Sequence, residues 1–240
     1  MHNVAPHESG AAGEERLLEK LDDRTTVWIR LNETTDVPEG KEWVDIPHGH
    51  YRSVFGATDR APVPGRMLQF GLLRPYKGVE ALIAAFCRTD DAAASLRIVG
   101  KPYSAEYGEH IVSLCANDPR ITTELDFVPD SALADEVRDA ELVVLPYTEM
   151  HNSGVILVSL SLDRPVLAPR TRVNEALAAE VGPGWIHFFD DALGPEVLVE
   201  TLHAVRTGSG APVPDLSARD WEVVGLRHRD AYRRALQRAR

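Results

Sequence analysis

Two cations in one short loop are the residues of this sequence best suited to bind a phosphate group. Arg74 and Lys77 lie in the stretch 71–78, which reads GLLRPYKG. An apolar run, 67–73, precedes this loop, and a helical pattern, 79–86, follows it. An arginine offers a planar fork to phosphate oxygens and a lysine offers a compact charge, while the N–H groups at a helix start add positive potential. The loop therefore suits a diphosphate.

A second polar loop repeats this arrangement further along the chain. A short buried strand, 142–145, leads into the loop PYTEMHN, 146–152, and an apolar helix follows. Ser153 can cap that helix, and Gly154 lets a ligand approach the backbone closely. Glu149 adds a carboxylate, which suits the hydroxyl groups of a ribose or a hexose beside a phosphate site. The alternative for Ser153 and Gly154 is that they only begin the helix and contact no ligand. The alternative for Glu149 is that it is a solvated loop residue.

The elements that would position both loops alternate regularly along the chain. The expected strands are 67–72, 95–99, 121–127, 142–145, 166–168 and 185–189. The expected helices that follow them are 79–87, 104–116, 131–139, 153–162, 173–181 and 194–206, the third opened by Asp130 and Ser131 as a cap. This alternation predicts an α/β fold with a doubly wound, parallel, six-stranded Rossmann-like sheet. Ligands bind such a sheet outside the carboxyl ends of its strands, where both loops would lie.

The two ends of the chain do not continue this alternation. The N-terminal part predicts only a helix and two strands, at 15–21, 25–31 and 42–46, which is a partial second α/β domain. Two stretches rich in glycine and proline predict linkers, at 56–66 and 207–214. The segment 216–238 predicts one long helix, whose apolar stripe comprises Trp221, Val224, Ala231 and Ala235.

Two segments of this sequence together resemble a known family. They are FGLLRPYKG, 70–78, and PYTEMHNSGVILVSLSLDRPVLAP, 146–169. These segments are similar to the donor loop and the signature segment of the group 1 glycosyltransferases of GT-B architecture, and the resemblance is closest over 66–206. It implies an enzyme that transfers a sugar from a nucleoside diphosphate sugar, GDP- or UDP-linked, to a hydroxyl of a glycan or lipid-linked acceptor. The pathway implied is surface polysaccharide or glycolipid synthesis.

The resemblance also assigns roles to three parts of the chain. Residues 61–207 would be the donor-binding domain, residues 1–60 a remnant of the acceptor-binding domain, and residues 215–240 a helix that crosses back to it. By that interpretation a second chain would supply the missing half-domain. We therefore expect that this chain binds a nucleotide but transfers sugar poorly alone. The alternative function is a non-catalytic nucleotide-binding partner subunit, or the degenerate half of a split glycosyltransferase.

The resemblance implies both donor-binding and catalytic residues. The donor-binding residues would be Gly71, Arg74, Lys77, Gly100, Lys101, Val128, Asn152, Ser153, Gly154 and Val155. His2 falls where the family often places a histidine near the transferred sugar, and Glu149 would orient that sugar, so both are catalytic candidates. For His2 the alternative is an ordinary loop histidine. GT-B enzymes generally need no catalytic metal, no metal-ligand spacing occurs here, and the donor is the co-substrate rather than a cofactor. The resemblance leans towards retention of configuration.

The sequence departs from the family pattern in three places. Leu72 stands where many members carry an arginine. The two signature glutamates of the family, counted back from Pro165, would fall at Met150 and Val158, and neither is acidic. Glu149 lies one place from the first and can serve for it. Nothing replaces the second, which typically binds the donor ribose.

Composition narrows the class of protein. The 240 residues carry a net charge of −11, which argues against nucleic acid as a partner. No apolar run approaches the roughly 18 residues that a membrane helix needs, so we expect a cytoplasmic protein. The arginine-rich segment 227–240 is either a solvated helix face or a peripheral contact with the anionic inner face of a membrane. Cys87 and Cys115 are expected to be reduced core residues.

Overall fold

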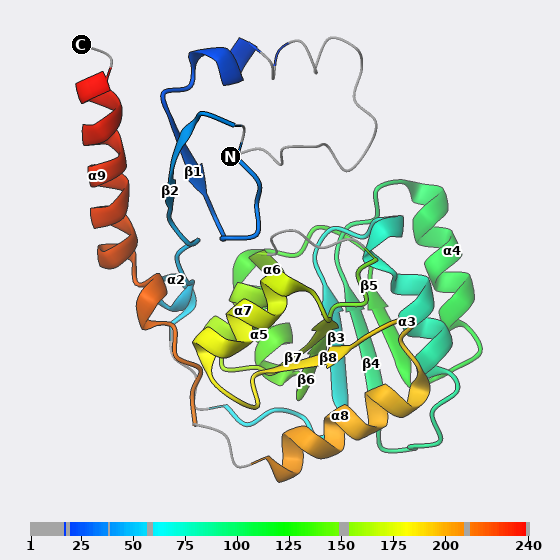
Figure 1. Cartoon of the computed structure of the whole chain (residues 1–240). Coiled ribbons are helices and arrows are strands. Elements are labelled where there is room, and N and C mark those ends of the chain that lie inside the picture. The colour runs from blue at the N-terminus through cyan, green and yellow to red at the C-terminus, as the bar shows by residue number, and fades with distance from the viewer. Residues whose placement is uncertain are drawn as a thin grey trace. The chain divides into compact units, whose positions relative to one another are not determined.

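The computed structural model describes residues 17, 20–37, 39–56, 60–148, 154–208 and 212–238. Within these residues the chain forms two compact units, which are described separately. The smaller unit contains the described residues up to His48 and from Glu222 onward, and the larger unit contains Gly49–Trp221. Figure 1 shows the elements of both in chain order.

The core of the larger unit is a parallel sheet of six strands. They are β3 (Arg66–Phe70), β4 (Ser95–Val99), β5 (Ile121–Glu124), β6 (Leu142–Val144), β7 (Val166–Pro169) and β8 (Ile186–Phe189). Their order across the sheet is β5-β4-β3-β6-β7-β8, so the chain moves outward from β3 and then returns to its other side with β6. The predicted doubly wound α/β fold is confirmed, and its point of reversal lies between β3 and β6.

Helices cover both faces of this sheet (Figure 1). One layer consists of α3 (Val79–Phe86), α4 (Ala105–Cys115) and α8 (Pro195–Thr207), which share a buried apolar cluster with Met67, Leu96 and Leu142. The other layer consists of α5 (Asp130–Asp139), α6 (Gly154–Ser161) and α7 (Arg172–Val181), which share a second cluster with Leu68, Phe70 and Val143. Successive residues of a strand point to opposite faces, so one apolar strand such as β3 serves both layers.

The smaller unit combines both ends of the chain. β1 (Val27–Arg30) and β2 (Glu42–Asp45) pair in parallel, and residues 20–24 are helical. The last helix, α9 (Trp221–Arg238), contributes Val224 and Ala231 to a buried cluster with Ile46. The C-terminal helix therefore packs against the N-terminal strands. The functional roles assigned to 1–60, 61–207 and 215–240 stay predictions.

The C-terminal helix begins later than the sequence predicts. Ser217–Arg219 form a separate 3-10 turn, η2, and the extended Asp220 follows it, so α9 starts at Trp221 rather than at 216. Trp221 is also 49% exposed, so it is not part of the buried stripe of α9. Its indole N–H instead donates to the carbonyl of His50, at 2.8 Å.

Other local predictions also differ from the structure. α5 begins at Asp130 with Pro129 at the N-cap position, so the expected side-chain cap is absent. A short helix, α2 (Arg52–Phe55), occupies a stretch where the sequence predicts none. Cys115 is buried as predicted, whereas Cys87 is exposed because it lies at the C-terminal end of α3. Across the described ranges, every helix is too short or too polar to cross a membrane.

Candidate functional site

The reversal of strand order brings the two polar loops together. β3 and β6 are neighbours in the sheet, so the loops that follow them leave the same edge side by side. The N–H and the hydroxyl of Thr148 both donate to the carbonyl of Tyr76, each at 3.0 Å. The rings of Tyr76 and Tyr147 meet edge to face, with 6.5 Å between their centroids. The two loops found separately in the sequence therefore form one structure.

A glycine allows the closest approach between these loops. Gly78 separates the 3-10 turn η1 (Pro75–Lys77) from α3, and its φ of 65° and ψ of 25° lie in the left-handed region. A Cβ at this position would lie 2.0 Å from the carbonyl oxygen of Pro146. Only glycine satisfies both the backbone angles and this contact. Gly78 thereby fixes the 71–78 loop against the loop that follows β6.

Lys77 is buried where the loops meet. Lys77 is only 8% exposed. Its ammonium lies 5.3 Å from the ring centroid of Tyr147, which is a cation–π contact. The position that a Cβ of Gly71 would occupy is 3.3 Å from the Lys77 Nζ and 3.4 Å from Cγ2 of Val155. The ammonium therefore lies beside Gly71, and Val155 of the first turn of α6 comes close to the same point. In the part of the chain that the structure describes, it forms no ion pair with a carboxylate.

The surroundings of this ammonium favour an anion. Burial, together with the positive charge of Arg74, lowers the pKa of Lys77 from 10.5 to about 8. The protein thus holds two cations near each other, one of them largely removed from water. A bound diphosphate would offset both the lost hydration and the repulsion between the cations. The geometry supports the phosphate-binding role that the sequence predicts for this pair.

Nucleoside diphosphate binding is expected to weaken as the pH rises above about 8. Below that pH Lys77 already carries the charge that a phosphate needs. Above it the free protein must first take up a proton, so the affinity should fall about tenfold per pH unit. Calorimetric titration with GDP between pH 7 and pH 9 measures this decline. Lys77→Arg is the matched control, because an arginine stays charged and should remove most of the dependence. An equal decline in both proteins would contradict this role for Lys77.

Gly100 and Lys101 lie at the same edge of the sheet, after β4. A Cβ at Gly100 would come within 2.0 Å of the Gly71 carbonyl oxygen, so Gly100 has a packing role beneath the first loop. The carbonyl of Lys101 accepts a hydrogen bond from the N–H of Leu73, at 2.9 Å, and its side chain is exposed. The structure therefore brings both residues beside the Lys77 loop. Their contact with a nucleotide stays a prediction.

The other predicted site residues are divided by what the structure describes. Gly154 and Val155 form the first turn of α6, which faces Lys77 as described above. Val128 is partly buried and packs against the core cluster on the α5 side of the sheet. Four predicted residues lie outside the described residues, and their roles stay predictions: His2, Glu149, Asn152 and Ser153.

Sequence reasoning missed residues that shape this site. Tyr147 lies beneath the Lys77 ammonium, and Gly78 and Thr148 hold the two loops together. A Pro-Tyr pair directly after a buried strand was a usable signal for Tyr147. The sequence places Gly78 at the end of the donor loop, but its contact with Pro146 could not be read from the sequence, because Pro146 belongs to the other loop.

Comparison with known proteins gives a consistent set of relatives. A family model described as "Glycosyl transferases group 1" matches residues 64–192. A curated protein of Xanthomonas campestris pv. campestris, named GDP-mannose:glycolipid 4-beta-D-mannosyltransferase, is 46% identical over 238 residues, covering 98% of this chain and 68% of its own length.

Solved structures with the same fold are more distant in sequence. Sucrose-phosphate synthase of Thermosynechococcus elongatus gives a TM-score of 0.70 at 17% identity, covering 99% of this chain and 65% of its own. HepE of Anabaena in complex with UDP and glucose gives 0.65 at 15% identity, covering 94% and 64%. This chain thus spans about two thirds of the length of the relatives that it matches.

Proposed function

Because the chain belongs to the group 1 glycosyl transferases, we propose that it binds GDP-mannose and transfers mannose to a hydroxyl of a glycolipid acceptor. The identity of 46% with the Xanthomonas mannosyltransferase supports the choice of donor and acceptor. The observation that carries the proposal is the buried Lys77 ammonium, which lies beside Gly71 at the point of strand reversal. A donor diphosphate would bind there.

The residues of this site would act on the leaving group. When the bond between the anomeric carbon and the diphosphate breaks, negative charge grows on the phosphate oxygens. Lys77 and Arg74 would stabilise that charge, with the Lys77 ammonium held over the Tyr147 ring before the donor binds. The name of the Xanthomonas relative specifies a β-linked product, and GDP-mannose is an α-linked donor. We therefore propose inversion in one displacement, in place of the retention that the family resemblance suggests.

The remaining steps involve residues that the structure does not describe. In an inverting displacement the acceptor oxygen bonds to the anomeric carbon as GDP leaves, and a base takes the hydroxyl proton. His2 and Glu149 remain the proposed candidates for that base and for orienting the sugar. A glycolipid acceptor also fits contact with an anionic membrane surface at the cytoplasmic face. The exposed arginines of α9 would make that contact: Arg227, Arg229, Arg233, Arg234 and Arg238.

A second candidate function is a nucleotide-binding subunit that works with another polypeptide. The observation that favours it is the smaller unit, whose described sheet has only two strands. This candidate predicts the same GDP binding but no mannosyl transfer by the purified chain. Addition of a polypeptide corresponding to the remaining third of the curated relative would then restore transfer.

Calorimetric titration of the purified chain with GDP, UDP and ADP tests the proposed function. We expect GDP to bind at least about tenfold more tightly than UDP or ADP, a difference of about 1.4 kcal/mol. Arg74→Ala and Lys77→Ala should each weaken GDP binding by tenfold or more, since each removes a charged phosphate contact. Equal binding of all three nucleotides would reject the choice of GDP. Absence of binding to any of them would reject the proposed site.

A further inference from the structure

Tyr51, at the start of the larger unit, is anchored to the C-terminal end of α6. Its backbone N–H donates to the hydroxyl oxygen of Ser161, at 2.9 Å. Ser161 is buried and in turn donates to the carbonyl of Leu157, at 2.6 Å. A serine in an apolar helix is thus used to hold the main chain of Tyr51.

The side chain of Tyr51 runs from this anchor towards the other end of the helix. Its hydroxyl oxygen lies 3.6 Å from the position that a Cβ of Gly154 would occupy. Gly154 and Ser161 are the first and last residues of α6, about 10 Å apart along its axis. Val158 lies between Gly154 and Ser161 on the same face of the helix. Both Val158 and Tyr51 are partly buried against one core cluster. The tyrosine therefore lies along α6 and presents its hydroxyl at the first turn.

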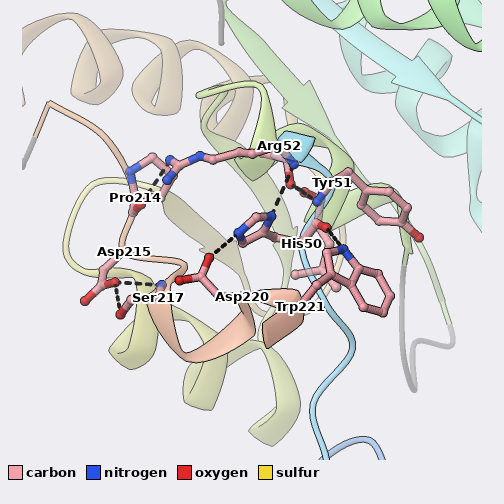
Figure 2. Close-up of polar contacts among 10 residues, drawn as sticks. His50, Tyr51, Arg52, Pro214, Asp215, Ser217, Asp220 and Trp221 are labelled. Atoms are coloured by element: carbon pink, nitrogen blue, oxygen red, sulfur yellow. Dashed lines mark hydrogen bonds and ion pairs between the residues drawn. The ribbon is translucent and has the colours of Figure 1, made fainter. Parts of the chain in front are cut away.

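The residues on either side of this tyrosine are also held in place (Figure 2). His50 Nε2 lies 2.6 Å from a carboxylate oxygen of Asp220, and the His50 carbonyl accepts the indole N–H of Trp221. Arg52 donates to the carbonyl of Pro214, at 3.1 Å. In Figure 2 the phenol ring points away from this polar cluster. The chain on both sides of Tyr51 is thus held in place.

The first turn of α6 is approached by two side chains with protons to donate. The Lys77 ammonium and Cγ2 of Val155 lie within 3.3 and 3.4 Å of the same point, the position of a Cβ on Gly71, and the Tyr51 hydroxyl lies 3.6 Å from the Cβ position of Gly154. Burial raises the pKa of the Tyr51 phenol, so the hydroxyl keeps its proton at neutral pH. Gly154 itself is exposed and has no side chain, so a ligand can reach the space beside the hydroxyl.

We propose that the Tyr51 hydroxyl donates a hydrogen bond to a phosphate oxygen of the bound nucleoside diphosphate, opposite Lys77. This inference rests on the proposed function, because it adds a ligand contact to the same donor site. By this inference Tyr51, at the start of the larger unit, belongs to the donor site, although no sequence motif marks this residue. A hydrogen bond from a neutral donor to a charged phosphate corresponds to a tenfold to hundredfold change in affinity.

Tyr51→Phe tests the inference, since it removes one oxygen and keeps the ring. We expect GDP to bind at least tenfold more weakly by calorimetry, with an unchanged thermal unfolding midpoint. Tyr232→Phe on α9, which is 60% exposed, is the matched control and should bind GDP like the wild type. Wild-type affinity in Tyr51→Phe would overturn the inference. If Lys77→Met loses GDP while Tyr51→Phe keeps it, the proposed function stands and only this inference fails. If the wild type binds no GDP, the proposed function fails first.

A direct measurement covers the case in which Tyr51→Phe unfolds. With 3-fluorotyrosine at position 51, the fluorine resonance should shift on titration with GDP, because the adjacent hydroxyl gains a charged acceptor. A resonance that stays unchanged at saturating GDP would overturn the inference.

Discussion

Replacing Lys77 with methionine is expected to weaken nucleoside diphosphate binding about 100-fold and, at the same time, to stabilise the fold. Methionine has a similar length and no charge, so it fills the space without a buried ammonium. Burial with Arg74 nearby lowers the Lys77 pKa from 10.5 to about 8, which corresponds to a penalty of about 3 kcal/mol for the charged form. The cation–π contact with Tyr147 offsets part of it. The net gain in unfolding free energy should be about 1–2 kcal/mol, while the GDP affinity falls about 100-fold.

The pH dependence of this gain has a definite sign. The pKa of Lys77 is lower in the folded chain than in the unfolded chain, so the folded state binds fewer protons between about pH 8 and pH 10.5. Wild-type stability should therefore rise across that range. The gain in unfolding free energy of Lys77→Met over the wild type should have its full value below pH 8 and should vanish near pH 10.5. Urea unfolding at pH 7 and pH 10 measures both values.

Lys101→Met is the control for this experiment, because Lys101 is exposed at the same edge of the sheet. It should leave the unfolding free energy within about 0.5 kcal/mol of the wild type. Destabilisation by Lys77→Met would contradict the interpretation. It would indicate that a carboxylate outside the described residues pairs with the ammonium.

Gly78→Ala should be among the most damaging single-methyl substitutions in the larger unit. The new Cβ would lie 2.0 Å from the Pro146 carbonyl oxygen, so the two loops would have to separate. We expect a loss of about 3 kcal/mol or more in unfolding free energy, because a steric clash with backbone adds to the strain of a left-handed alanine. GDP binding should also weaken at least tenfold, since Lys77 is adjacent in the chain.

Gly56→Ala is the matched control for this clash. Gly56 has φ 73° and ψ 169°, which an alanine tolerates less well than the angles of Gly78. Among the described residues other than its chain neighbours, no atom lies within 4 Å of its Cβ position, so we expect conformational strain alone there. Urea unfolding should show a larger loss for Gly78→Ala than for Gly56→Ala. Equal losses would mean that the contact with Pro146 has little energetic effect.

The sequence by itself determined the fold class and the location of the candidate site. Short apolar runs such as 142–145 and 166–168, alternating with helical segments, have few arrangements other than a parallel sheet covered on both faces. The same local information placed Arg74 and Lys77 after a strand, where such sheets bind ligands. Local apolar pattern and loop chemistry were sufficient, because both are properties of neighbouring residues.

Only the tertiary structure decided the environment of those residues. The burial of Lys77 depends on Tyr147, and the left-handed glycine at 78 depends on Pro146, both on a loop that approaches only because β6 lies beside β3. Trp221 is not part of the buried stripe predicted for its helix. Its indole N–H donates instead to the carbonyl of His50, 171 residues away in sequence. Tyr51 reaches Gly154 through an anchor on Ser161. Contacts of this range follow from strand order and packing, which no local pattern encodes.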